Sequence, residues 1–186
     1  RALSAALEAG FLPPKEGRTL AVLTGGEPLR QNPELLIREL QLSGFLVQLE
    51  TAGTIWRDFL LEPNQALQVV ISPKTPKLAP AFERALERVG LEGAARPFGT
   101  AFFLKYVIRA GEGGEDGLPI GSTQRPGARA RLFRPPEGFP RDQVFVSPCD
   151  DYDDELNHAN LRAARESALR HGYRLGVQLH KLADLP

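Results

Sequence analysis

The sequence predicts an α/β fold built on a parallel sheet. Apolar stretches of strand length alternate with stretches of helical periodicity, and most of these strands are apolar on both faces. That pattern is typical of parallel strands covered by helices. The chain has 186 residues, of which 42% are hydrophobic, so it can bury one substantial core. We therefore expect a single domain over residues 1–186.

The order of the predicted elements follows from their boundaries. Glycine and proline bound most of the apolar runs, and Gly44 and Gly172 are suited to end helices. Asn32 followed by Pro33 favours a helix start, with Asn32 as the cap. The predicted strands are 18–25, 45–51, 66–72, 101–109, 143–148 and 173–181, and the predicted helices are 2–10, 33–44, 79–90 and 154–171.

Residues 110–141 interrupt this alternation. They are rich in glycine, proline and arginine and show no apolar period, so we expect a long insertion that is mobile in part. Its arginines could cover an anionic substrate or be solvated, and we favour the second interpretation. These arginines are Arg125, Arg129, Arg131 and Arg134.

Composition excludes some classes of partner. Lys plus Arg equals Asp plus Glu at 23 each, so no generally basic surface for nucleic acid is expected. No apolar run reaches the roughly 18 residues that span a membrane. A single cysteine, Cys149, excludes an internal disulfide and fits a cytoplasmic location. The first residue is Arg1 and methionine is absent, so we expect a piece of a longer polypeptide whose N-terminal part is missing.

Polar groups follow the apolar strands. Ligands of parallel α/β folds bind at the carboxyl ends of strands, so these groups predict one site. In "TGGEP" the glycines let a ligand approach the backbone, and Glu27 can accept hydrogen bonds from an ammonium group, which suits a ligand with an amino-acid head. The alternative is a plain strand–helix turn. The other polar groups are Glu50–Thr54, Ser72–Lys74, Lys105, Ser147–Asp150, Gln178, His180 and Lys181.

Several of these residues have competing interpretations. Lys105 lies within an apolar strand and needs a partner or a ligand. His180 is a site candidate, whereas His158 and His171 are expected to be solvated on a polar helix. The acidic residues of 150–155 could bind a metal, but we favour an exposed helix start, where carboxylates complement the helix dipole.

Five blocks of the sequence resemble one family, in order. "LTGGEPLRQ", "VQLETAGT", "VISPK", "FFLKYVI" and the terminal "GYRLGVQLHKLADLP" are similar to those of 7-carboxy-7-deazaguanine synthase. This is a radical S-adenosylmethionine (SAM) enzyme of the queuosine and deazapurine pathway. "GGEP" alone marks radical SAM enzymes broadly, whereas the full succession is much more specific. The resemblance covers the chain except 110–141.

The resemblance implies a fold and an activity. The fold would be an incomplete (β/α) barrel, truncated at its N-terminus in this chain. The family binds SAM, a [4Fe–4S] cluster and Mg²⁺. As a carbon–nitrogen lyase, it converts 6-carboxy-5,6,7,8-tetrahydropterin to 7-carboxy-7-deazaguanine, with ring contraction and loss of ammonia. An electron donor such as a flavodoxin or ferredoxin and a homodimer are also implied.

The resemblance also implies site residues. Thr24 and the terminal carboxylate of Pro186 would meet the substrate, and the family usually has Gln where Ser147 stands and often Met where Cys149 stands. Ala52 stands where Asn is common. The implied SAM-binding residues are Gly26, Glu27, Ser72, Pro73, Lys74, Ser147, Pro148, Cys149 and Asp150. Further possible site residues are Glu50, Lys105, His180 and Lys181.

The largest departure from the family concerns the cluster. Its three thiolate ligands leave the fourth iron open for SAM. This sequence has only Cys149, so no catalytic residue or metal ligand is assigned within it. We expect an active parent protein and an inactive chain. A degenerate module that binds SAM or a pterin without catalysis, or an unrelated α/β domain, are the alternatives.

Overall fold

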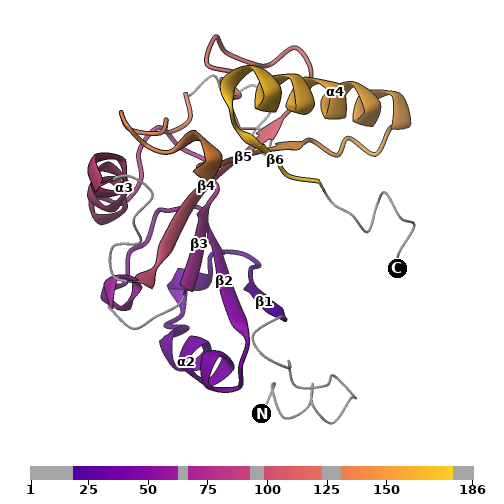
Figure 1. Cartoon of the computed structure of the whole chain (residues 1–186). Helices are drawn as coiled ribbons and strands as arrows, with labels where there is room; N and C mark the ends of the chain where they lie inside the picture. The colour runs from indigo at the N-terminus through magenta and orange to yellow at the C-terminus, as the bar shows by residue number, and fades with distance from the viewer. Residues whose placement is uncertain (1–18, 63–66, 93–98, 123–130, 178–186) are drawn as a thin grey trace.

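The fold is a six-stranded parallel sheet whose strands lie side by side in chain order (Figure 1). The computed structural model describes residues 19–62, 67–92, 99–122 and 131–177. The α/β prediction is confirmed, and the sheet does not close into a barrel within this part of the chain. The strands are β1 (Leu20–Leu23), β2 (Leu46–Thr51), β3 (Leu67–Ile71), β4 (Ala101–Ile108), β5 (Val144–Pro148) and β6 (Arg174–Leu175).

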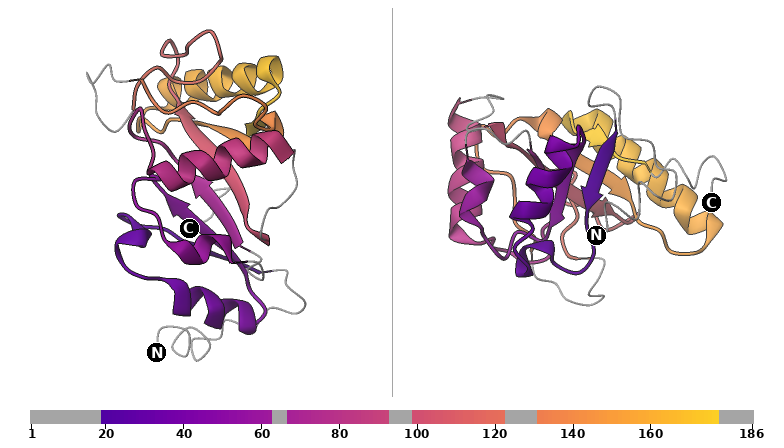
Figure 2. Two further views of the ribbon diagram at one scale, coloured as in Figure 1. Left: turned by 90° about the vertical axis from the view of Figure 1, so that its left-hand side faces the viewer. Right: turned by 90° about the horizontal axis from the view of Figure 1, so that it is seen from below.

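Three α-helices connect and cover the strands. They are α2 (Glu34–Leu42), α3 (Pro80–Glu92) and α4 (Asp154–His171). Short 3₁₀ turns lie at η1 (Pro28–Arg30), η2 (Asp58–Leu61) and η4 (Arg141–Gln143). Figure 2 shows α3 lying in front of the strands, with α2 and α4 on either side of it. None of the described helices is long and apolar enough to cross a membrane.

The helices bury one face of the sheet. Val47, Leu49 and Val69 on this face are inaccessible to solvent, since alternate residues of a strand point to the same side. Phe82 of α3 packs edge-on against Phe102 of β4, with ring centroids 6.4 Å apart. Trp56 also packs edge-on against Phe82, with centroids 4.8 Å apart. The core therefore lies between the sheet and its helices.

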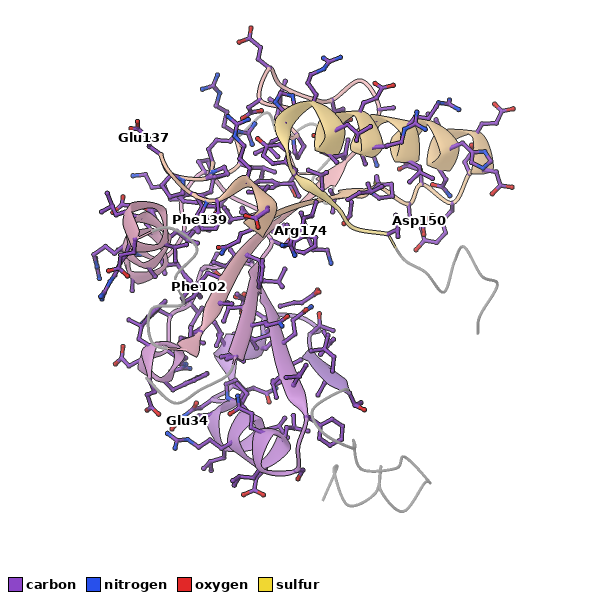
Figure 3. All side chains as sticks on the ribbon, in the orientation of Figure 1. Glu34, Phe102, Glu137, Phe139, Asp150 and Arg174 are labelled. Carbon is purple, nitrogen blue, oxygen red and sulfur yellow. The ribbon has the colours of Figure 1, made fainter. Side chains whose placement is uncertain are left out.

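The opposite face, which we call the open face, carries the polar strand residues. Strand register places Gln48 beside Gln68, and Lys105 beside Phe145. Phe145 in turn pairs with Arg174, whose side chain lies beside the sheet in Figure 3. A face that is polar on central strands departs from the usual apolar parallel sheet, and this indicates a ligand-facing surface.

The helix boundaries predicted from capping residues agree with the structure to within one or two residues. Asp153 caps α4 by accepting a hydrogen bond from the backbone N–H of Leu156 at 2.9 Å, and Gly172 ends it in the left-handed conformation at φ 75°. Helix α2 begins at Glu34, one residue later than expected, with Pro33 at the cap position. Asn32 still accepts a hydrogen bond from the N–H of Glu34, at 3.3 Å.

Part of the insertion at 110–141 packs on the rest of the molecule. Leu118, Leu132 and Phe139 are buried in the core. The backbone N–H of Phe133 donates to the carbonyl of Thr75 at 2.9 Å. The hydroxyl of Ser167 in α4 donates to the carbonyl of Gly117 at 2.6 Å. Scattered apolar residues thus anchor the insertion without any regular period.

Two single-residue expectations are corrected. Arg134 is not solvated, because its guanidinium pairs with Asp116 at 2.8 Å and donates to the carbonyl of Pro119. His171 is half-buried and its ring stacks on Tyr173 at 5.7 Å between centroids. Arg131 is exposed as expected, whereas Arg125 and Arg129 lie outside the described residues.

The last strand is shorter than predicted. Strand β6 ends at Leu175, and Gly176 and Val177 continue in irregular structure. The backbone N–H of Gly176 still donates to the carbonyl of Val146. The chain passes so close to Ser147 here that a Cβ at position 176 would lie 2.5 Å from its hydroxyl oxygen. The remainder of the predicted strand and the helix expected at 2–10 lie outside the described residues.

Candidate functional site

Glu27 is fixed at the carboxyl edge of the sheet. One of its carboxylate oxygens accepts hydrogen bonds from the Thr51 hydroxyl at 2.8 Å and from the Leu29 N–H at 3.2 Å. The other oxygen accepts from the Ala52 N–H at 2.9 Å. A carboxylate has about four acceptor positions, so these three bonds leave room for one more donor. The carboxylate is thus preorganised by β2 and can still receive a ligand.

The glycines before Glu27 leave space beside this carboxylate. Gly25 adopts φ 101°, which side chains rarely tolerate, and this conformation turns the chain after β1. Gly26 has no heavy atom within 4 Å of the position a Cβ would take. Thr24 and both glycines are exposed. A ligand can therefore approach this backbone closely.

Charged residues from β2, from β4 and from the loop after β3 lie close together near the carboxyl edge of the sheet. The Lys105 ammonium lies 3.4 Å from the Glu50 carboxylate, so the expectation that this strand lysine has a partner or a ligand is confirmed. The Gln48 amide donates to the same carboxylate at 3.1 Å. The Lys74 ammonium donates to the Ser72 hydroxyl at 3.1 Å. Lys105 thus pairs with Glu50, while Lys74 contacts a neutral hydroxyl and the charge of Glu50 acts on it through space.

The environment of Lys74 disfavours the protonated form of its side chain. Burial lowers the pKa of its ammonium, the nearby positive charge of Lys105 lowers it further, and Glu50 acts in the opposite direction. The negative charge of a bound anion would raise this pKa and so act against both causes. The insertion borders this spot, because Gly121 and Leu132 line a small crevice with both lysines.

A larger hollow lies toward the opposite edge of the sheet, where the first residues of β4, β5 and β6 line it. Its volume is about 390 Å³, within the range of small-molecule sites. Phe103 and Phe145 pack edge-on within its wall, at 5.7 Å between centroids, and the Arg174 guanidinium lies over Phe145. Apolar rings beside amide groups suit a planar heterocycle. The other polar lining residues are Gln48, Gln68, Thr100, Asp142 and Gln143.

We call the carboxyl edge of the sheet the rim. Glu27 and Ser72–Lys74 lie along its first part, and the segment after β5 forms its second part. The N–H of Cys149 continues the sheet by donating to the carbonyl of Ile108 at 2.8 Å. Asp150 accepts hydrogen bonds from the Asn157 amide and the Tyr152 N–H, both at 3.2 Å. Figure 3 labels Asp150 where the chain turns toward α4. Ser147 and Pro148 lie half-buried beside them.

Sequence reasoning missed three residues of this rim. Arg109, Asp151 and Asn160 form a bonded group behind the segment after β5. Asp151 was seen only as part of an acidic run, and Asn160 as one residue of a polar helix. Their signal is weak in a sequence, because only the fold brings the end of β4 to the side of α4.

The acidic run begins a helix, as we favoured. Asp153 is the cap of α4, and Asp154 and Glu155 occupy its first turn. Across the described residues, no three His, Cys, Asp or Glu side chains gather in a way that could hold a metal ion. The predicted site residues His180, Lys181 and Pro186 lie outside the described residues.

Comparisons with known proteins point to one group. No family model matches the chain. The 7-carboxy-7-deazaguanine synthase of Rhodospirillum rubrum is 47% identical over 172 residues, and that of Rickettsia prowazekii is 30% identical over 166 residues. The chain is a homologue of these synthases. The resemblance predicted from the five sequence blocks is therefore confirmed.

The matches cover most of the chain but not most of its relatives. Each alignment covers 89% of this chain, but only 65% of the Rhodospirillum protein and 59% of the Rickettsia protein. The crystal structure of QueE from Escherichia coli covers 95% of this chain with a TM-score of 0.52 at 21% identity, and 62% of that structure is matched. This likeness shows a common fold, and the open parallel sheet is consistent with an incomplete barrel.

Proposed function

We propose that the chain carries the SAM-binding and substrate-binding part of a 7-carboxy-7-deazaguanine synthase. The parent protein would convert 6-carboxy-5,6,7,8-tetrahydropterin to 7-carboxy-7-deazaguanine as a radical SAM carbon–nitrogen lyase. The observation that carries this proposal is the Glu27 carboxylate, which is held by three hydrogen bonds beside the open backbone of Gly26. That arrangement suits the ammonium group of an amino-acid head.

The two halves of the rim would hold the two ends of SAM. Glu27 and Gly26 would receive the methionine ammonium and carboxylate, and Ser72–Lys74 would line the ribose and carboxylate. The segment Ser147–Asp150 would meet the adenosyl end with backbone groups, since its side chains differ from the family pattern. When bound, SAM supplies hydrogen-atom abstraction from the substrate through its adenosyl group.

The open face would hold the pterin. Its carboxylate would lie near the ammonium groups of Lys74 and Lys105, whose charges exceed that of Glu50. The Glu50 carboxylate would accept a hydrogen bond from a ring N–H. Thr24 and the terminal carboxylate of Pro186 would complete the substrate contacts.

The residues of this chain do not fit the iron–sulfur cluster. Three thiolates are needed, and Cys149 is the single cysteine of the sequence. Its sulfur is also buried at the far end of the rim from Glu27 along the strand order. We therefore expect no turnover from these 186 residues alone. The cluster, Mg²⁺ and reduction by a flavodoxin or ferredoxin belong to the proposed parent protein, as do a homodimeric state and a cytoplasmic location.

The single cysteine favours a second candidate, a SAM- or pterin-binding module without catalysis. Reconstitution with iron and sulfide separates the two candidates when it is applied to the protein expressed from the complete reading frame. A brown product with broad visible absorption supports the enzyme. A colourless protein that still binds SAM supports the module.

Replacement of Gly26 tests the SAM site itself. Gly26→Ala adds a methyl group where the structure has space, so the fold should persist. The methyl group would obstruct a ligand on the backbone, and SAM affinity should fall about tenfold, equivalent to about 1.4 kcal/mol. Saturation-transfer NMR can follow this weak binding. Gly113→Ala is the matched control, because Gly113 also has open space but lies in the insertion. Equal SAM affinity in both variants would contradict the proposal.

A further inference from the structure

A buried amide joins three chain segments behind the rim. Asn160 of α4 is 1% exposed, and its amide nitrogen donates to the carbonyl of Cys149 at 3.0 Å and to the Asp151 carboxylate at 2.8 Å. Its amide oxygen accepts from the N–H of Ala110 at 2.8 Å. The ends of β4 and β5 are thus tied to one side chain of α4.

A charged pair completes this group. The Arg109 guanidinium makes two bonds to Asp151, at 3.1 Å and 2.6 Å, in the bidentate geometry of strong ion pairs. The hydrogen bond from Arg109, followed by that from Asn160, holds the pKa of the Asp151 carboxyl below its usual range. The carboxylate is therefore charged at neutral pH and orients both donors.

The strand ladder does not hold the end of the rim segment. The last ladder bond runs from the N–H of Cys149 to Ile108, and beyond it the chain leaves the sheet. The Cys149 carbonyl accepts from the Asn160 amide, and the Asp150 carboxylate accepts from Asn157, one helical turn earlier, and from the N–H of Tyr152. A buried carbonyl that loses its donor costs more than the bond itself is worth, so these bonds define the conformation of the segment.

We infer that Asn160 is a positioning residue that holds the segment Ser147–Asp150 in the conformation that receives the adenosyl end of SAM. The inference rests on the proposed function, because the proposal assigns SAM to this segment. Asn160 itself would not contact SAM. It acts through the Cys149 carbonyl and through Asp151, which Arg109 fixes from β4.

The thiol of Cys149 reports on this segment directly. It is the only cysteine in the sequence, so a disulfide reagent such as DTNB reads one site. Burial raises the pKa of this thiol, and the reactive species is the thiolate, so the unsubstituted chain should react slowly. Asn160→Leu keeps the branched shape and changes no charge. We expect its DTNB reaction under native conditions to be at least about tenfold faster, the factor that corresponds to about 1.4 kcal/mol of lost local stability.

Two further variants make the test decisive. Asn157→Ala removes the bonds to Asp150 and to the N–H of Asp151 from a less buried position, so it serves if Asn160→Leu fails to fold. It should give a smaller acceleration in the same direction. Arg162→Ala on the exposed side of α4 is the control and should leave the rate unchanged.

SAM binding separates positioning from a purely structural role. In folded Asn160→Leu, SAM affinity should fall about tenfold, as for a residue of the rim. In the unsubstituted chain, bound SAM should slow the reaction of the thiol with DTNB. Unchanged thiol rates in both asparagine variants would overturn the inference. A faster thiol reaction with undiminished SAM affinity would also overturn it. If the unsubstituted chain binds no SAM, the proposed function fails. The rate of the DTNB reaction still decides whether Asn160 holds the segment.

Discussion

Replacing Glu27 with glutamine should destabilise the unliganded protein. The glutamine oxygen can keep the bonds from Leu29 and Thr51, but its NH₂ group then faces the N–H of Ala52, where an acceptor is needed. One charge-assisted bond is lost and two donors oppose each other. Hydrogen bonds to charged groups contribute roughly 1.5–3 kcal/mol, so we expect the free energy of unfolding to fall by about 2 kcal/mol.

Urea unfolding followed by tryptophan fluorescence measures this loss. Trp56 is the only tryptophan and packs on Phe82 in the core, so its emission follows the fold. Glu87→Gln removes the same charge from an exposed position of α3 and is the control. If Glu27→Gln unfolds at the same urea concentration as Glu87→Gln, the three bonds do not organise the rim, and the argument for a preorganised carboxylate is refuted.

Three further results are expected. Gly53→Ala should lose at least about 1 kcal/mol more stability in urea than Gly111→Ala, because both positions have positive φ but only at Gly53 would a Cβ meet neighbouring side chains, at 2.8 Å; equal losses would contradict this. Lys105→Gln should raise the pKa of Lys74 in NMR titrations of methylated lysines, because a repelling charge is removed. The folded pKa of Lys74 lies below its unfolded value, so its contribution to stability rises with pH between the two, and this rise should shrink in the variant. A further decrease of that pKa would contradict the assignment. Phe82→Ala should cost about 3–5 kcal/mol in urea unfolding, and a loss under about 1 kcal/mol would show that Phe82 does not join α3 to the sheet.

The sheet and its rim could be predicted from local signals. Apolar runs, glycine boundaries and the proline after Asn32 act within a few residues, so the element order followed from the sequence alone. Parallel pairing then brings Glu27, Glu50 and Lys105 to one region without any knowledge of their contacts. The Lys105 partner was expected because an apolar strand does not hold a free charge.

The insertion and the group around Asn160 could not be predicted in this way. The buried residues of the insertion are isolated in sequence, and their partners lie in α3, α4 and the loop after β3. The amide of Asn160 resembles that of any polar helix residue until the fold places Cys149 and Ala110 beside it. Such contacts join residues 50 and 11 positions apart, and no local pattern encodes them.

The sequential strand order has a consequence for biosynthesis. Each strand pairs with the strand synthesised just before it, so the sheet can grow one strand at a time as the chain leaves the ribosome. Two contacts of the insertion are different. The carbonyls of Gly117 and Asp116 accept hydrogen bonds from Ser167 and Tyr173, which are synthesised 50 and 57 residues later. These two contacts can therefore form only after α4 and Tyr173 have been synthesised, when β1 to β5 are already available to pair.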